Sequence, residues 1–168
     1  MSAPETRILP ADAAGISEAA RLILSGEPVA VPTETVYGLA ADATHGEAVA
    51  RIYASKGRPS FNPLIVHVRD LEQAERIGRF DDRARELAKR WWPGPLTLVV
   101  PLREDAGIAS LVAAGLPTIA LRASAHPVMQ AVIAAADRPL AAPSANASGS
   151  ISPTRAEHVR ASLGGRIP

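Results

Sequence analysis

The chain has 168 residues and a formal net charge of +1, and it contains no cysteine. This length predicts one domain, and 47% hydrophobic with 21% charged residues argue against disorder. A net charge this close to zero does not indicate nucleic-acid binding. The absence of cysteine excludes disulfides, thiolate nucleophiles and Cys-ligated zinc. We find neither an apolar run of membrane-spanning length nor a signal peptide, so we expect a cytoplasmic protein without membrane contact.

The first half of the chain alternates between helical and strand patterns. Asp12 is a plausible N-cap, and apolar residues then repeat at helical spacing until Gly26, which favours a helix end. Apolar runs beside proline predict short strands at 28–32 and 63–68, with a helix over 47–55 between them.

The clearest helical pattern begins at Asp81 or Asp82 and stops at Pro93, the first residue of a Pro-Gly-Pro run. Strands are expected to follow at 96–100 and 118–121. Four residues share one face of the predicted helix: Ala84, Leu87, Ala88 and Trp91.

The last third of the chain predicts a helix over 126–136 with one buried stripe, and then a short strand at 140–142. A capping-box pattern of Thr154 and Glu157 opens a final helix, which ends at Gly164. We find no repeat or linker, and 15 prolines are too many for a helical bundle. The predicted fold is one α/β domain, although its strand order does not follow from the sequence.

The sequence lacks the common nucleotide-binding and hydrolase motifs: G-x-x-x-x-G-K-[ST], G-x-G-x-x-G, G-x-S-x-G and H-E-x-x-H. Its four histidines show no metal-ligand spacing. What remains is a set of polar residues at predicted strand ends, where open α/β sheets usually keep their ligand sites.

Three of these polar groups lie before residue 68. The run 32–38 carries two threonines, a carboxylate and a phenol, which could bind a small polar ligand or simply form a Thr-stabilised turn. Lys56 offers a compact charge and Arg58 a planar donor fork, a combination suited to phosphates or to a solvated basic loop. His67 shares a strand face with Ile65, so it points into a cleft or is a hydrogen-bonded core residue.

Two further polar groups follow. Thr118 and Arg122 bracket an apolar strand, and an arginine there can bind a carboxylate through two parallel hydrogen bonds or form a salt bridge at the rim. Segment 141–154 is dense in small residues and hydroxyls, and it leads into a helix N-terminus, which favours anions. That density indicates a ligand site rather than an ordinary loop.

Taken together and in this order, these segments resemble the YrdC-like family, the threonylcarbamoyl-adenylate synthases of tRNA modification. The resemblance runs from about residue 15 to the C-terminus. The matching stretches are Pro32–Leu39, Lys56–Pro59 with Asn62–Leu64, Trp92–Thr97, Arg122 with His126-Pro127, and Pro143–Gly149.

The resemblance implies a single YrdC-like domain over 1–168, with its core at about 12–168. The implied fold is a twisted mixed sheet with flanking helices and a concave basic cavity. The implied reaction converts L-threonine, bicarbonate and ATP to threonylcarbamoyl-adenylate and pyrophosphate, with Mg²⁺ held by the ATP phosphates. Separate proteins would transfer the threonylcarbamoyl group to the tRNA adenosine beside the anticodon. Family members usually continue with another strand and loop, or a second domain, which we expect this chain to lack.

Residue by residue, the resemblance assigns L-threonine and bicarbonate to Thr35, His67, Arg122 and Ala142. It assigns ATP to Lys56, Arg58, Asn62, Thr118, Ser144, Asn146 and Ser152. Lys56 and Arg58 are the expected catalytic residues, because they would offset charge on the leaving pyrophosphate. The carbamate would attack the α-phosphorus directly, which agrees with the missing nucleophile. We therefore expect Lys56→Ala and Arg58→Ala to lower turnover far more than stability.

Two other interpretations stay open. A domain of the same fold could bind tRNA or double-stranded RNA without catalysis, through a local basic patch on a protein whose net charge is close to zero. A weak tRNA contact would also be compatible with the enzyme. The second alternative is the carbamoyl-adenylate chemistry of the YrdC-like module in hydrogenase maturation proteins, which comes with zinc-finger-like cysteines that this chain lacks.

Overall fold

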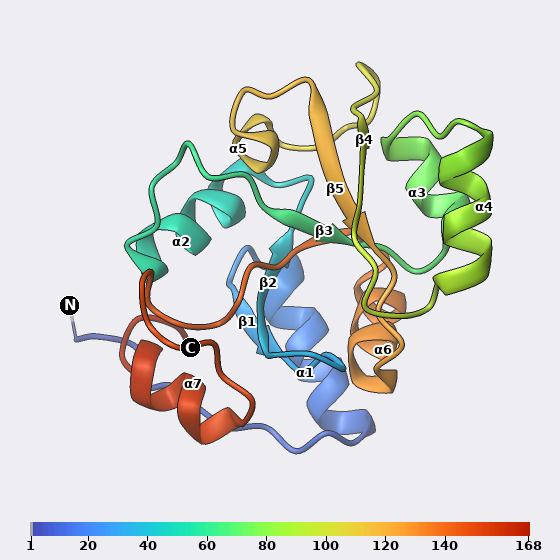
Figure 1. Cartoon of the computed structure of the whole chain (residues 1–168). Coiled ribbons are helices and arrows are strands. Elements are labelled where there is room, and N and C mark those ends of the chain that lie inside the picture. Colours follow the sequence, from blue (N-terminus) through green and yellow to red (C-terminus); the bar gives the residue numbers. More distant parts are fainter. Residues whose placement is uncertain (1) are drawn as a thin grey trace.

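A computed structural model, which describes residues 2–168, has a six-stranded mixed sheet at its centre (Figure 1). The sheet order is β1-β2-β6-β3-β5-β4. Strands β3 and β5 are parallel, and the other four neighbouring pairs are antiparallel. The carboxyl ends of β3 and β5 therefore meet at one edge. The strands are β1 (Val29–Val31), β2 (Gly38–Asp42), β3 (Ile65–His67), β4 (Leu98–Pro101), β5 (Thr118–Arg122) and β6 (Leu140–Ala141).

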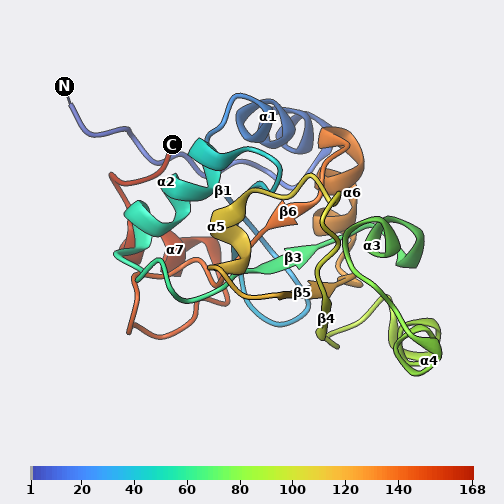
Figure 2. The ribbon, with the colours of Figure 1, turned by 90° about the horizontal axis from the view of Figure 1, so that it is seen from above.

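Helices surround this sheet (Figure 2). Helices α1 and α6 pack against each other and against β2 and β6, forming the smaller of two apolar clusters. The larger cluster takes residues from the remaining helices. The helices are α1 (Ala13–Leu24), α2 (Gly46–Lys56), α3 (Leu71–Ile77), α4 (Asp82–Trp91), α5 (Ser110–Ala113), α6 (Pro127–Ala136) and α7 (Ala156–Leu163).

The sheet is covered on both faces along β2 but on only one face along β5 and β4. Leu39 of β2 belongs to the larger apolar cluster and the next residue, Ala40, to the smaller one. On β5, Leu121 lies in the larger cluster, whereas Ala120 on the opposite face is only half-buried. Val99, which pairs with Ala120, is 66% exposed. This part of the second face is therefore open to solvent.

The structure confirms the predicted mixed sheet with flanking helices and most of the predicted elements. The side chains of Asp12 and Asp81 cap α1 and α4, each accepting a backbone N–H at 2.8 Å. Elements β2, α3 and α5 were missed. Strand β2 is buried on both faces and so shows no polar alternation, while α3 and α5 have only seven and four residues.

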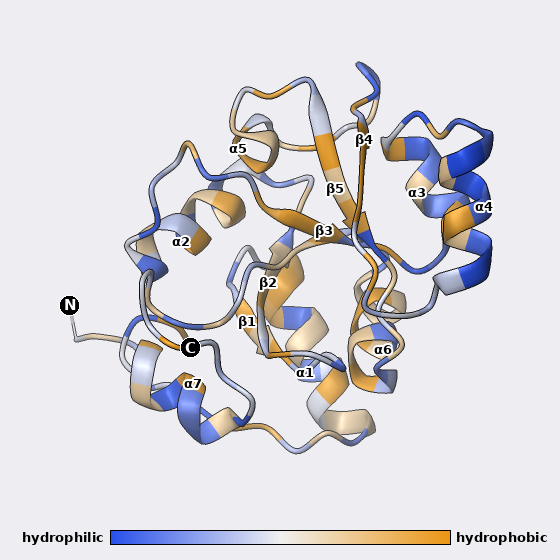
Figure 3. Ribbon diagram, viewed as in Figure 1, coloured by the Kyte–Doolittle hydropathy of each residue, from blue (hydrophilic) through white to orange (hydrophobic). Residues whose placement is uncertain are grey.

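Two sequence expectations about helices are wrong in detail. The predicted apolar face of α4 buries Ala88, but Leu87 and Trp91 are exposed, because α4 lies outside α3 with a polar outer surface (Figure 3). Thr154 does not cap α7. The N-cap position is Arg155, which makes no side-chain capping bond.

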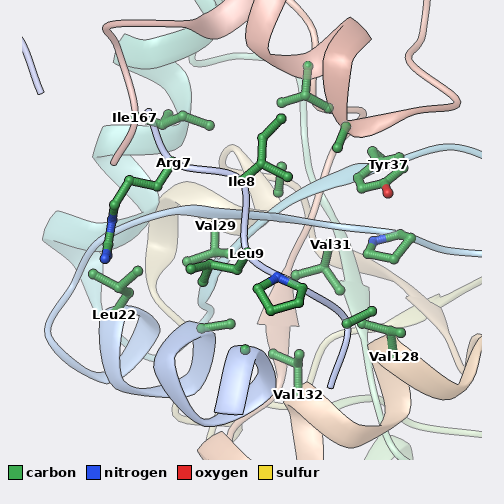
Figure 4. Close-up of a pocket in the computed structure, with 18 of the residues that line it drawn as sticks. Arg7, Ile8, Leu9, Leu22, Val29, Val31, Tyr37, Val128, Val132 and Ile167 are labelled. Atoms are coloured by element: carbon green, nitrogen blue, oxygen red, sulfur yellow. The ribbon is translucent and has the colours of Figure 1, made fainter. Parts of the chain in front are cut away.

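A mostly apolar cavity of about 130 Å³ lies between the N-terminal segment, α1 and β1 (Figure 4). Ile8, Leu9, Leu22 and Val132 are among the residues that line it. Pro32 and Tyr37 of the 32–38 run also line it, but none of the residues assigned to L-threonine, bicarbonate or ATP does, so the candidate site lies elsewhere. Within residues 2–168, no helix is long and apolar enough to cross a membrane.

Candidate functional site

Three of the four predicted amino-acid-binding residues, Thr35, His67 and Arg122, meet at the carboxyl ends of the parallel strands β3 and β5. His67 and Arg122 are the last residues of these strands and are direct partners in the register. Strand alternation places both on the same face as Ile65 and Ala120, the face that is open farther along the sheet. The placement agrees with the rule that ligands bind at the carboxyl ends of parallel strands.

Arg122 connects the end of β5 to the loop that precedes β2. Its Nη1 donates to Thr35 Oγ1 at 3.1 Å, and its Nη2 donates to the carboxylate of Glu34. Glu34 also accepts from the Ser124 hydroxyl at 2.9 Å and from the backbone N–H of Ala125. Burial alone would raise the pKa of Glu34, but the bonds from Ala125 and Ser124 and the charge of Arg122 outweigh it and lower that pKa. Glu34 is therefore an ionised partner of Arg122.

His67 is almost fully buried, with 3% of its surface exposed. Burial and the neighbouring charge of Arg122 lower the pKa of His67 to about 3, although Glu34 acts in the opposite direction. The imidazole is consequently neutral near pH 7 and can offer one donor and one acceptor nitrogen. A neutral ring suits the binding of a polar group more than the neutralisation of an anion.

Lys56 ends α2 and points into the loop that follows β6. Its Nζ donates to the backbone carbonyl oxygens of Ser144 and Asn146, and only 3% of the residue is exposed. The backbone N–H of Ser148 donates back to the Lys56 carbonyl at 2.8 Å. Burial, assisted by the charge of Arg58, lowers the pKa of Lys56 to about 8. Lys56 thus fixes the 144–148 loop.

These contacts revise one expectation from the sequence. We expect from the sequence that Lys56→Ala affects turnover far more than stability. Loss of the ammonium, however, would leave the Asn146 carbonyl without a donor and the Ser144 carbonyl with only the N–H of Asn146. A change at Lys56 must therefore affect stability as well. The expectation is unchanged for Arg58, which is half-buried.

Arg58 lies in the loop between α2 and β3. Its Nη2 donates to the carbonyl oxygen of Pro63 at 2.9 Å, and its Nε approaches that of Asn62 at 3.4 Å. The Asn62 carbonyl also accepts from the hydroxyl of Tyr53 at 2.8 Å. Across residues 2–168, no carboxylate lies within 4.0 Å of the charged groups of Lys56 or Arg58. Neither cation is neutralised by an acidic partner.

The segment after β6 joins these two groups of residues. Ala142 donates its N–H to the Ile65 carbonyl at 2.9 Å, at the start of β3 and two residues before His67. Two residues later, Ser144 forms a β-bridge with Gly38 at the start of β2. A Cβ on Gly38 would come within 3.2 Å of the Ala142 side chain, so this position requires a very small residue. One residue assigned to the amino acid, Ala142, and two assigned to the nucleotide, Ser144 and Asn146, therefore lie on one continuous stretch of backbone.

Three buried polar side-chain atoms within the described part of the chain have no hydrogen-bond partner: His67 Nδ1, Arg122 Nε and Asn146 Oδ1. All three belong to residues that the sequence assigned to ligand binding. A buried polar atom without a partner costs about 1–3 kcal/mol, and native proteins keep few of them. The three atoms without a partner thus belong to three of the predicted ligand residues.

Two predicted residues stand apart from these groups. Thr118 is four residues from Arg122 on the same strand face, roughly 13 Å along the strand. Ser152 is exposed and makes no side-chain hydrogen bond in the structure of residues 2–168. Sequence reasoning also missed the contacts of Glu34 with Ser124 and Ala125. Glu34 was noted in its motif, but nothing in the sequence linked it to residues about 90 positions away.

The described residues contain no group of three or more His, Asp or Glu side chains that could hold a metal ion. The cations Lys56 and Arg58 instead fit a ligand that brings its own negative charge. A magnesium ion at this end of the site would need ligand oxygens, such as those of a polyphosphate.

The family model for Sua5, YciO and YrdC, described as "Telomere recombination", matches residues 21–168. Threonylcarbamoyl-AMP synthase of Bacillus subtilis is 52% identical over 153 residues, which covers 90% of this chain and 44% of that protein. The protein of the same name from Pyrococcus abyssi is 49% identical and covers 89% of this chain and 44% of its own length. The chain thus spans less than half of these two relatives.

Among solved structures, P. abyssi Sua5 complexed with L-threonine superposes with a TM-score of 0.90 and 46% identity. The match covers 98% of this chain and 47% of that one. Sequence, family model and structure agree over nearly the whole length of the chain, which therefore belongs to the Sua5/YciO/YrdC family.

Proposed function

We propose that the chain catalyses the formation of threonylcarbamoyl-adenylate and pyrophosphate from L-threonine, bicarbonate and ATP. The product would serve the modification of the tRNA adenosine beside the anticodon, through separate transfer proteins. The names of the B. subtilis and P. abyssi relatives support the reaction, and the threonine in the P. abyssi Sua5 structure supports the amino acid. No contact within residues 2–168 favours the alternative of a non-catalytic RNA-binding module.

The Arg122 end of the site suits L-threonine. Threonine is a zwitterion with no net charge, and the Arg122–Glu34 pair is likewise neutral overall. Arg122 retains an unpartnered buried Nε–H that can donate to the substrate carboxylate. The neutral ring of His67 and the hydroxyl of Thr35 would supply further polar contacts. We also assign the buried Ala142 to this ligand.

The Lys56 and Arg58 end suits the phosphates of ATP. Two cations without acidic partners create a positive potential that a polyphosphate can neutralise. The loop that Lys56 fixes presents Ser144 and Asn146, and Asn146 keeps an unpartnered amide oxygen. We assign Asn62, Thr118 and Ser152 to the remainder of the nucleotide. When bound, Mg²⁺ would neutralise phosphate charge through the phosphate oxygens.

The chemistry needs positioning and charge stabilisation. The ammonium of threonine first loses a proton to solvent. The resulting amine and bicarbonate form a carbamate with loss of water, and a carbamate oxygen attacks the α-phosphorus of ATP. The bond between the α-phosphorus and the bridging oxygen breaks, and pyrophosphate leaves. Arg122 would hold the carboxylate of the nucleophile, while Arg58 would stabilise charge on the leaving group. Lys56 would keep the 144–148 loop in place and add positive charge.

The observation that carries this proposal is the coincidence of the three unpartnered buried atoms with the predicted ligand residues. The test is pyrophosphate release from ATP, measured with and without L-threonine and with and without bicarbonate. We expect release only when both are present, and an at least hundredfold lower rate in Arg58→Ala. A matched control is Arg76→Ala, which removes an exposed arginine paired with Glu72 on α3 and should leave the rate unchanged. Threonine-independent release would overturn the proposal.

A further inference from the structure

The carboxylate of Glu34 is held by three different donors. They are the guanidinium of Arg122, the fully buried hydroxyl of Ser124 and the backbone N–H of Ala125. Two of these donors belong to the turn between β5 and α6, and the third ends β5. Glu34 itself lies 88 residues earlier than Arg122, in the loop between β1 and β2. The Glu34 side chain therefore connects the loop between β1 and β2 to the end of β5 and to the turn that follows it.

A substrate carboxylate could in principle take the place of Glu34. The substrate carboxylate would then form these three hydrogen bonds, but Glu34 would lose the same three. The total number of hydrogen bonds would not increase. Binding at Arg122 Nε is different, because that N–H is buried and has no partner. A carboxylate placed there satisfies a donor that is otherwise unsatisfied, which is a net gain. The contacts thus favour a Glu34 that stays in place while the substrate binds beside it.

We propose that Glu34 is a positioning residue for the amino-acid end of the site, which orients Arg122 and holds Thr35 against it. This inference rests on the proposed function, because it takes L-threonine as the ligand of Arg122. With Nη2 held by Glu34 and Nη1 by Thr35, the guanidinium has one fixed orientation. Thr33 strengthens the same loop by donating to the Val36 carbonyl at 2.7 Å. The direction of the buried, unpartnered Nε–H of Arg122 is thereby fixed as well.

The test compares L-threonine and ATP binding to the wild type, Glu34→Gln and Ser124→Ala by calorimetry, with thermal unfolding of each. The Glu34→Gln change retains the shape of the side chain but loses its charge, and Ser124→Ala removes one of the three bonds. We expect the threonine Kd to rise at least tenfold in Glu34→Gln and about threefold in Ser124→Ala. The ATP Kd should change less than twofold in both variants. The matched control is Glu75→Gln, which loses an ion pair with Arg85 on the surface of α3 and α4 and should bind both ligands as the wild type does.

Tighter or unchanged threonine binding by Glu34→Gln would overturn the inference, because it would mean that Glu34 competes with the substrate or has no part in the site. Equal weakening of threonine and ATP binding would also overturn it, since that is the result of a general structural defect. Failure of the wild type to bind threonine would instead refute the proposed function, and the inference with it.

Discussion

The two ends of the candidate site differ in whether their positive charges are neutralised by an acidic side chain. At one end, Arg122 is paired with the carboxylate of Glu34 and lies beside a buried histidine of lowered pKa. At the other end, Lys56 and Arg58 contact only neutral backbone carbonyl groups. The charge at the Arg122 end is therefore neutralised before any ligand binds, and we call it the balanced end. The positive charge at the end of Lys56 and Arg58 is not neutralised, and we call it the unbalanced end.

This difference gives each end a different preferred ligand. The balanced end would bind threonine through hydrogen bonds of fixed direction rather than through an excess of positive charge. An unbalanced end attracts a polyanion and gains most when the anion arrives. The net charge of +1 for the whole chain does not reveal this difference in charge between the two ends of the site.

The largest effect is expected from removing the cation at the balanced end. Arg122→Ala leaves the Glu34 carboxylate without its charged partner, so the free energy of unfolding should fall by about 3 kcal/mol. Adding Glu34→Gln should recover at least half of this loss, because the unpaired charge disappears. Urea denaturation of the two single variants and the double variant measures this coupling. Additive losses would show that the two side chains do not act as a pair.

At the unbalanced end, Lys56→Met should lower the free energy of unfolding by about 2 kcal/mol, because the Asn146 and Ser144 carbonyl groups each lose the hydrogen bond from the ammonium. The chain offers a natural control in its only other lysine, the exposed Lys89 on α4. Lys89→Met should change stability by less than about 0.5 kcal/mol. Equal effects of the two substitutions in urea denaturation would contradict a structural role for Lys56.

The pKa of Lys56 makes a further, smaller effect testable by pH. Its value of about 8 in the folded chain lies below the ordinary 10.5, so between these values the unfolded chain binds more protons. Raising the pH from 8 to 10.5 should therefore stabilise the wild type relative to Lys56→Met. The measurement is the difference in unfolding free energy between the two proteins at several pH values. A difference that is constant across this window would contradict the lowered pKa.

The smallest effect concerns His67, for which the account predicts almost no change. Because its pKa is lowered to about 3, the ring stays neutral between pH 5.5 and 7.5, and the Kd for L-threonine should vary less than twofold over that range. Calorimetry across the range checks this. A transition in affinity centred near pH 6.5 would show that His67 titrates normally and is not enclosed as the structure has it.

The sequence predicted which residues are neighbours in the structure better than it predicted their contacts. Thr35, His67 and Arg122 could be assigned together because each lies at a strand end within an ordered set of motifs, and the structure brings them together. The direction of Lys56 could not be predicted, since a loop composition shows a charge but not whether it faces a ligand or a backbone carbonyl. Glu34 was visible only as one polar residue of a turn, because its partners are distant in sequence and become neighbours only when β5 and the loop before β2 meet. Strand β2 was missed for the same reason. It shows no alternation of polar and apolar residues because both of its faces are buried, and the helices that bury them come from distant parts of the chain.

The most direct test of this division is to measure the Kd of ATP and of L-threonine for Arg58→Ala and Arg122→Lys, beside the wild type. We predict that Arg58→Ala weakens ATP at least tenfold and leaves threonine within twofold. Arg122→Lys, which keeps the charge but loses the planar donor fork, should do the reverse. If either substitution weakens both ligands equally, the two ends of the site do not have separate tasks and the account is wrong.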